Sequence, residues 1–97
     1  MRIAKIVVDS SQLENYKTAL KEGISTAVSK EPGVLSMYAV FDKANPSHIT
    51  VFETYADLNA YQSHIQTVHF KKYKATVEHM VKSLELVDVI PIVLESK

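Results

Sequence analysis

The side chains that are able to do chemistry gather in residues 52–73, FETYADLNAYQSHIQTVHFKKY. This stretch holds Glu53 inside a β-like run, two of the four histidines, His64 and His69, and five of the eight aromatic residues: Phe52, Tyr55, Tyr61, Phe70 and Tyr73. An imidazole accepts or releases a proton near neutral pH, and a carboxylate can act as a general acid or base. Any acid–base catalysis by this protein is therefore expected to use groups from this stretch.

His64 and His69 are the expected proton carriers. They are five positions apart, so they would not share one face of a continuous helix. A helix break near Gln66 and Thr67 would nevertheless let both rings turn into the same cleft. The alternative for each histidine is a hydrogen-bonded capping or packing role.

Glu53 and a tyrosine extend this candidate site. Glu53 would be either a general acid or base, or a structural acid hydrogen-bonded to a neighbouring element. Tyr73 follows His69 by one helical turn, so its hydroxyl could reach the same ligand, although core packing is the commoner fate of such a tyrosine. His48 and His79 are expected at the surface.

The composition excludes several kinds of site. The chain has no cysteine, so disulfides, thiolate catalysis and cysteine-bound metals are absent. Its only glycines are Gly23 and Gly33, which are too few for a phosphate-binding loop. Two histidines and a glutamate, Glu53, would be enough ligands for a metal, but nothing in the sequence fixes their geometry. We therefore expect no metal and no cofactor.

The charge balance and the hydropathy limit the kinds of partner that the protein can have. Eleven Lys and Arg residues balance eleven Asp and Glu residues, whereas proteins that neutralise nucleic-acid phosphates normally show a basic excess. No apolar run approaches the roughly 18 residues of a membrane span, and the N-terminal residues lack a signal-peptide pattern. We expect a cytoplasmic protein that binds neither nucleic acid nor membrane.

The order of elements predicts one α+β domain over residues 1–97. Ser11 and Glu14 suggest a capping box for a helix that runs to about Lys30, and Asp57 and Thr67 suggest caps for two later helices. The expected strands cover residues 2–8, 34–42, 48–55 and 84–94. This β-α-β-β-α-β order is the ferredoxin-like pattern, an antiparallel sheet with its helices on one face.

The other face of such a sheet would carry uncovered Met, Leu, Val and Phe side chains. A domain of this size does not normally leave such a surface in water. We therefore expect a homodimer in which two sheets pack face to face about a two-fold axis. The apolar C-terminal strand could reach across to the partner.

Three features resemble the antibiotic biosynthesis monooxygenase family: Glu31-Pro32-Gly33 before a strand, the run FETYADLNAYQSH, and His69-Phe70 after it. The resemblance spans nearly the whole chain and implies a dimeric α+β barrel of ferredoxin-like subunits. It implies catalytic roles for Glu53, His64 and His69, a substrate-binding role for Phe70, and less directly substrate-binding roles for Tyr55, Tyr61 and Tyr73. The haem-degrading branch of the family is disfavoured, because the chain has no tryptophan and no asparagine in its first strand.

The leading hypothesis is a cofactor-independent monooxygenase that oxidises a small phenol or quinol with O2. The substrate would stack near Phe70 and Tyr73, His69 or His64 would take its proton, and Glu53 would orient the histidine or a tyrosine. One alternative is an isomerase of a small phosphorylated carbonyl compound of the quorum-signal type, whose phosphate Lys71, Lys72 or Lys74 would hold. The other is a non-catalytic dimeric protein that binds a small molecule.

Overall fold

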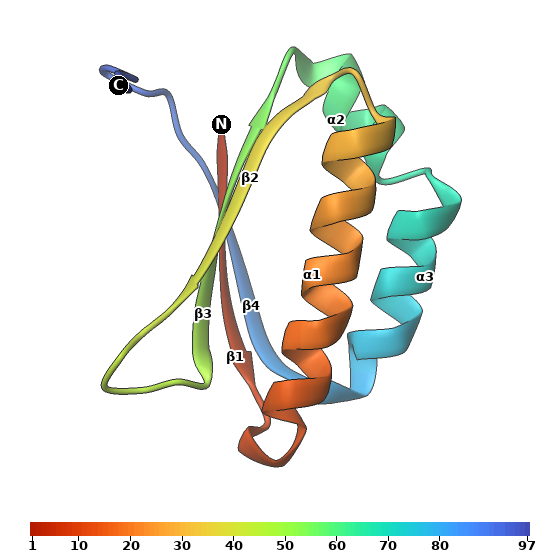
Figure 1. The fold of residues 1–97 in the computed structure, drawn as a ribbon, viewed down its shortest axis with the longest axis vertical. Helices are drawn as coiled ribbons and strands as arrows, with labels where there is room; N and C mark the ends of the chain where they lie inside the picture. The colour runs from red at the N-terminus through yellow and green to blue at the C-terminus, as the bar shows by residue number, and fades with distance from the viewer.

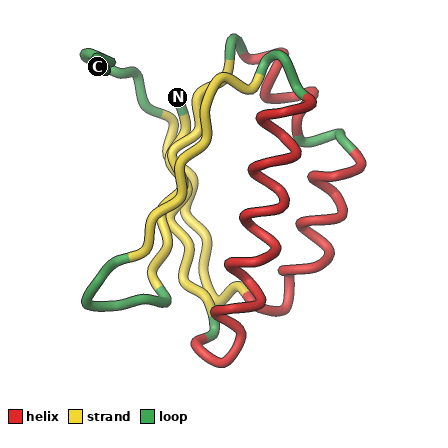
Figure 2. The backbone as a smooth tube through the Cα atoms, in the orientation of Figure 1, coloured by secondary structure: helices red, strands yellow, loops and turns green.

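The computed structural model describes residues 1–97 as a four-stranded antiparallel sheet with its helices on one face (Figures 1 and 2). The strand order is β2-β3-β1-β4. The predicted α+β ferredoxin-like fold is confirmed, with the second crossover divided between two helices. In chain order the elements are β1 (Arg2–Val8), α1 (Leu13–Lys30), β2 (Val34–Phe41), β3 (His48–Tyr55), α2 (Leu58–His64), α3 (Val68–Val77) and β4 (Val81–Asp88).

The core lies between the two central strands and the long helix α1. Ala4, Ile6 and Val8 alternate along β1 and are all buried, as are Ile49 and Val51 on β3. Because successive side chains of a strand point to opposite faces, this alternation directs one face of the sheet to the helices. The helices fill that side with a cluster that includes Tyr16, Leu20, Val77 and Met80.

The helix starts were predicted correctly in two of three cases. The Asp57 side chain accepts a hydrogen bond from the Ala60 amide, and Thr67 accepts one from the Phe70 amide. The capping box at Ser11 was wrong. The chain first makes a 3-10 turn over Ser10–Gln12 that Asp9 caps, and the Ser11 hydroxyl donates to Asp9 rather than capping α1.

The last strand was also misplaced, since β4 runs from Val81 to Asp88 rather than over residues 84–94. A second 3-10 turn, Glu78–Met80, ends the α3 segment and buries Met80, so Val81 can pair with Val8 at the end of β1. Val89 donates one more backbone hydrogen bond, to the Met1 carbonyl, and the apolar residues beyond it have no strand partner within this chain. They extend from the sheet on the side away from the helices (Figure 1).

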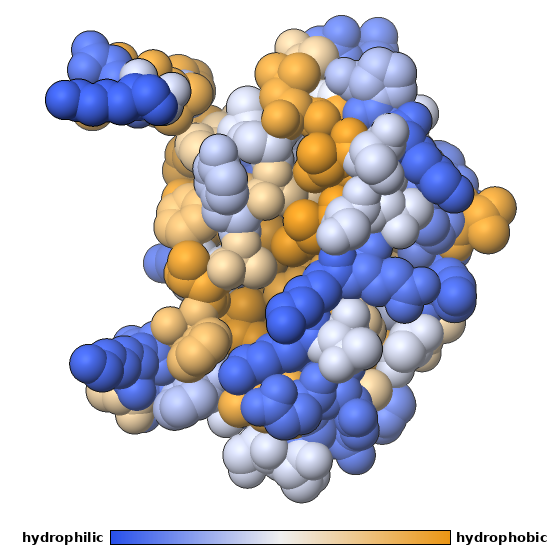
Figure 3. Space-filling view, in the orientation of Figure 1, coloured by the Kyte–Doolittle hydropathy of each residue, from blue (hydrophilic) through white to orange (hydrophobic).

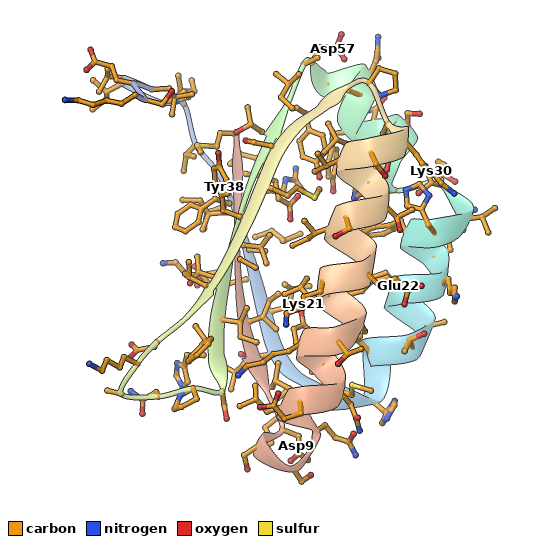
Figure 4. All side chains as sticks on the ribbon, in the orientation of Figure 1. Asp9, Lys21, Glu22, Lys30, Tyr38 and Asp57 are labelled. Atoms are coloured by element: carbon orange, nitrogen blue, oxygen red, sulfur yellow. The ribbon has the colours of Figure 1, made fainter.

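The face of the sheet opposite the helices carries one apolar row across all four strands. Tyr38 pairs with Phe52, Phe52 with Ile3, and Ile3 with Val87. Figure 4 shows Tyr38 on the side of β2 turned from the helices. The expected apolar open face is present, but Met37 lies on the helix side instead, where it lines a cavity.

None of the helices combines the length and the apolar character that crossing a bilayer requires.

Gly33 marks the closest approach between the turn after α1 and helix α2. A Cβ atom built there would lie 2.5 Å from the Ala60 Cβ, closer than two carbon atoms can pack. The chain has no glycine with a positive φ, so this contact, rather than the backbone conformation, explains the need for glycine. This contact between Gly33 and Ala60 holds α2 against the first residues of β2 and thereby sets the position of His64.

Gly33→Ala should lower the free energy of unfolding by about 1–3 kcal/mol, because the added methyl overpacks this contact. Combining it with Ala60→Gly should restore part of that loss, although Ala60→Gly alone costs about 1 kcal/mol of helix stability. Urea unfolding of the four proteins of this cycle measures the coupling. Strictly additive effects of the two substitutions would contradict the assigned contact.

Candidate active site

A cavity of about 120 Å³ lies between the helices and the central strands. Most of its lining is apolar, with a few polar groups among the hydrocarbon and aromatic walls, as in small-molecule pockets. Hydrophobic side chains in Figure 3 line the hollow between the sheet and the helices. The residues around the cavity that bear on its chemistry are Arg2, Gly23, Glu53, Tyr61, His64, His69, Phe70, Tyr73 and Lys74.

His64 and His69 line this cavity and share one hydrogen-bonded carboxylate, that of Glu31, which lies behind them and is not part of the lining. The Glu31 Oε2 atom lies 2.9 Å from His64 Nδ1 and 2.5 Å from His69 Nε2, so both imidazoles can donate to the same oxygen. The side chains of Glu31, His64 and His69 are 13%, 7% and 23% exposed. This largely buried arrangement leaves His64 Nε2 and His69 Nδ1 as the remaining ring nitrogens.

The Glu31 carboxylate is held in its charged form. Burial alone would raise its pKa, but the hydrogen bonds and charges of His64 and His69 outweigh burial and lower the pKa below its usual value. A carboxylate that stays ionised fixes the orientation of both imidazoles. It also stabilises the positive charge that an imidazole gains when it accepts a proton.

The three groups lie at helix ends, and the turns there bring them together. Glu31 follows the last residue of α1, His64 is the last residue of α2, and His69 lies in the first turn of α3. The Thr67 hydroxyl donates to the His64 carbonyl, 2.7 Å away, and closes the turn between α2 and α3. The predicted convergence of the two histidines across this turn agrees with the geometry.

The sequence reading missed Glu31 as a site residue. It assigned Glu31, Pro32 and Gly33 to a turn, and nothing in the local pattern indicates that the Glu31 side chain folds back onto residues 33 and 38 positions later. The pairing is a long-range contact. Two sequence signals mark the position: Glu31 belongs to the Glu31-Pro32-Gly33 feature of the family resemblance, and it is an acidic residue at the end of α1, where the helix dipole favours a basic residue.

Glu53 faces the same cavity but has a different partner. It accepts a hydrogen bond from the Tyr55 hydroxyl, 2.6 Å away. Burial, with this bond, raises the pKa of Tyr55. Glu53 was expected to orient either a histidine or a tyrosine. In the structure it bonds to a tyrosine, and Glu31 lies beside the histidines instead.

Tyr61 lies against Arg2 at another part of the wall. The Arg2 guanidinium stacks 3.9 Å from the centre of the Tyr61 ring, donates to the Tyr61 hydroxyl over 2.6 Å and pairs with Asp88 at 2.9 Å. The Tyr61 ring also packs edge-on against Tyr55. Arg2 lines the cavity and is, after Glu31, a second site residue that was not predicted from the sequence.

Phe70 and Tyr73 form an aromatic wall, with ring centres 6.3 Å apart. Phe70 also packs edge-on against His64 at 4.9 Å. The Tyr73 hydroxyl shares a 2.6 Å hydrogen bond with the hydroxyl of Tyr16, a fully buried residue. Burial raises the pKa of both phenols. The expected contact of the Tyr73 hydroxyl with a ligand therefore competes with an existing bond, while its ring is available as a wall.

The donor set of Glu31, His64 and His69 lies within 4.8 Å and is of a kind that binds Zn²⁺ or Fe²⁺. The carboxylate expected in such a trio was Glu53, but the structure brings Glu31 to the histidines instead. Both nitrogens stand at hydrogen-bonding distance from one oxygen. The geometry is that of a hydrogen-bonded unit. His48 and His79 are exposed, as predicted.

Solved structures with the same architecture include two that are similar in sequence. A candidate antibiotic biosynthesis monooxygenase from Bacteroides thetaiotaomicron VPI-5482 is 48% identical, with a TM-score of 0.96 over 99% of this chain and 93% of that chain. A candidate monooxygenase from Lactobacillus acidophilus NCFM is 32% identical, with a TM-score of 0.86 over 88% of this chain and 40% of that one.

A protein from Nitrosomonas europaea, at 18% identity, shares the fold with a TM-score of 0.89 over 95% of this chain and 97% of that chain. Among curated proteins, none matches this sequence. Residues 1–76 match the family described as antibiotic biosynthesis monooxygenase. With most of its length matched and a relative of nearly half-identical sequence, the chain belongs to the antibiotic biosynthesis monooxygenase family.

Proposed function

We propose that this protein is a cofactor-independent monooxygenase that oxidises a small phenol or quinol with O2. The observation that carries the proposal is the pair of imidazoles, His64 and His69, held by the Glu31 carboxylate in the wall of an apolar cavity. Family membership and the monooxygenase descriptions of similar structures support the reaction class.

The first step is removal of the phenolic proton. His69 is the preferred base, because it is the more exposed of the two imidazoles and lines the cavity. The Glu31 carboxylate stabilises the imidazolium that forms, as a buried acid does for a catalytic histidine. His64, whose ring packs between Phe70 and Tyr55, holds the carboxylate in place and is the alternative base.

The second step is electron transfer to oxygen. The phenolate is a much better electron donor than the phenol and reduces O2 by one electron, giving a phenoxyl radical and superoxide. The two combine at a ring carbon as a peroxide anion, which takes back the proton from the imidazolium to become a hydroperoxide and then loses water to leave a carbonyl. The overall change, phenol plus O2 to quinone plus water, is balanced without a further reductant. Apolar walls that exclude water protect the radical pair.

The remaining polar groups of the cavity are proposed to orient the substrate. Phe70 and Tyr73 would stack against its ring. Glu53, and Tyr61 with Arg2, would receive the polar substituents of the ring at other parts of the wall, whereas Tyr55, which is absent from the lining, would hold Glu53 in place. These assignments divide the two carboxylates between proton transfer at Glu31 and positioning at Glu53.

An isomerase of a small phosphorylated carbonyl compound is the second candidate. Arg2 and Lys74 line the cavity and would offer positive charge to a phosphate, whereas Lys71 and Lys72 are exposed and absent from its lining. The same histidines and carboxylate would move the proton. Such an enzyme would consume no oxygen, which separates it from a monooxygenase, and a binding protein would turn over neither class of compound.

The partner proposed for this chain is a second copy. The apolar row Tyr38, Phe52, Ile3 and Val87 crosses the open face of the sheet. Beyond β4, Ile90 and Ile92 are almost fully exposed, in a segment that extends on the same side as that face. Two sheets packed face to face would bury both features, and a stable dimer needs about 800 Å² from each subunit.

Oxygen uptake by metal-stripped protein, measured against hydroquinones and simple phenols, tests the reaction. We expect protein-dependent uptake that falls about 100-fold in His69→Ala, because a positioned base contributes at least this much. Glu31→Gln should lower uptake at least about tenfold, because it removes the charge that stabilises the imidazolium.

His79→Ala is the matched control, since His79 is exposed and does not line the cavity. Full turnover in both His69→Ala and His64→Ala would contradict the assigned base. No uptake above autoxidation across the whole panel would contradict the monooxygenase itself.

The Glu31 cluster should also make the stability of the folded protein decrease at acidic pH. The folded pKa of Glu31 lies below its usual value of about 4.5, so the stabilisation is complete above that pH and is lost as the pH falls through the folded pKa. Melting temperatures from pH 7 to pH 3 should therefore fall less steeply in Glu31→Gln than in wild type. Glu78→Gln, at an exposed site, should follow wild type, and equal slopes in all three would contradict the cluster.

Light scattering tests the dimer. Wild type should have twice the mass of one chain, and Tyr38→Glu should shift it toward the monomer, because it places a charge in the apolar row. Ser25→Glu, an exposed change on α1, should leave the mass unchanged. A monomeric wild type would refute sheet-to-sheet association.

A further inference from the structure

We propose that the cavity selects substrates built on a single aromatic ring, and that Gly23 is the specificity-determining position that keeps the space for this ring. The phenol or quinol class of the substrate rests on the proposed function. The size limit is a property of the cavity, and binding alone can test it.

The volume of the cavity sets the limit on size. An apolar cavity of about 150 Å³ in another protein holds one benzene molecule. The cavity here measures about 120 Å³ and is open on one side, so it has room for one ring, and a second fused ring would have to lie outside it. Glu53 and the two histidines are part of the same lining, so this ring would lie beside the acid–base groups.

Gly23 is an unfavourable residue for its position. It lies in the interior of the 18-residue helix α1, where glycine is less stable than alanine. Packing does not require it, because an added Cβ would lie 3.5 Å from the Tyr73 ring, an ordinary van der Waals distance. Gly23 does line the cavity, so a side chain there would take up volume that is now open.

The wall beside Gly23 is held in place. The Tyr73 ring faces Gly23, and the Tyr73 hydroxyl is tied to Tyr16, which is fully buried. Moving this ring aside to admit a larger ligand would break the 2.6 Å bond between the two hydroxyls. Gly23 and Tyr73 therefore bound the cavity as a fixed pair rather than a flexible gate.

Calorimetric binding of phenol and 2-naphthol under nitrogen tests the inference, because each carries one hydroxyl and neither turns over without O2. Wild type should bind phenol at least tenfold more tightly than 2-naphthol. Gly23→Ala should weaken phenol binding at least fivefold, and should raise Tm by about 4 °C because alanine favours the helix. Ser25→Ala, an exposed change on the same helix outside this cavity, should leave phenol binding unchanged.

Tyr16→Phe supplies a second test, since it frees Tyr73 without adding volume. It should reduce the preference for phenol over 2-naphthol. Equal affinity of wild type for the two phenols, or phenol binding in Gly23→Ala equal to that of wild type, would overturn the size limit. Selective binding of phenol without oxygen uptake in air would instead refute the monooxygenase proposal and leave the size limit standing.

Discussion

The site depends on one carboxylate oxygen that accepts hydrogen bonds from two imidazoles. Glu31 Oε2 joins the end of α1 to the end of α2 and the start of α3, so one largely buried group fixes three helix ends. The bonds favour the ionised carboxylate even though burial opposes it. Removing Glu31 would therefore leave two largely buried imidazoles without a common partner. The same contact that orders the α1–β2 turn thus orders the proposed base.

The architecture gives the two carboxylates of the site different surroundings. Glu53 projects from the central strand β3 and accepts a phenolic hydroxyl, whereas Glu31 comes from a turn and meets only imidazoles. A group on a central strand is fixed by the sheet. A group on a turn is fixed only by what it contacts, and here Gly33 supplies that constraint by letting α2 approach the turn closely. The fold therefore defines the Glu53 position directly and the Glu31 position through packing.

The fold and half of the site were predictable from local patterns. Alternation in residues 2–8 and 48–55, and the caps at Asp57 and Thr67, are properties of neighbouring residues and were read correctly. Glu31 and Arg2 were missed because their roles arise from contacts with residues 33 to 86 positions away in the chain. The last strand was misplaced for a related reason. The helical spacing of apolar residues continues past Val77, and only pairing with β1 decides that Val81 belongs to the sheet.

The low polarity of the cavity would favour the role proposed for the Glu31 cluster as a base. With both imidazoles neutral the cluster carries one negative charge, and a proton taken by either ring makes it neutral overall. Charges interact more strongly in a site walled by apolar groups than in water, so the carboxylate lowers the cost of forming an imidazolium there. In the proposed reaction, the phenolate left behind would have the apolar faces of Phe70 and Tyr73 on one side instead of solvent. A poorly solvated anion is a stronger electron donor, and this is the property that reaction with O2 requires.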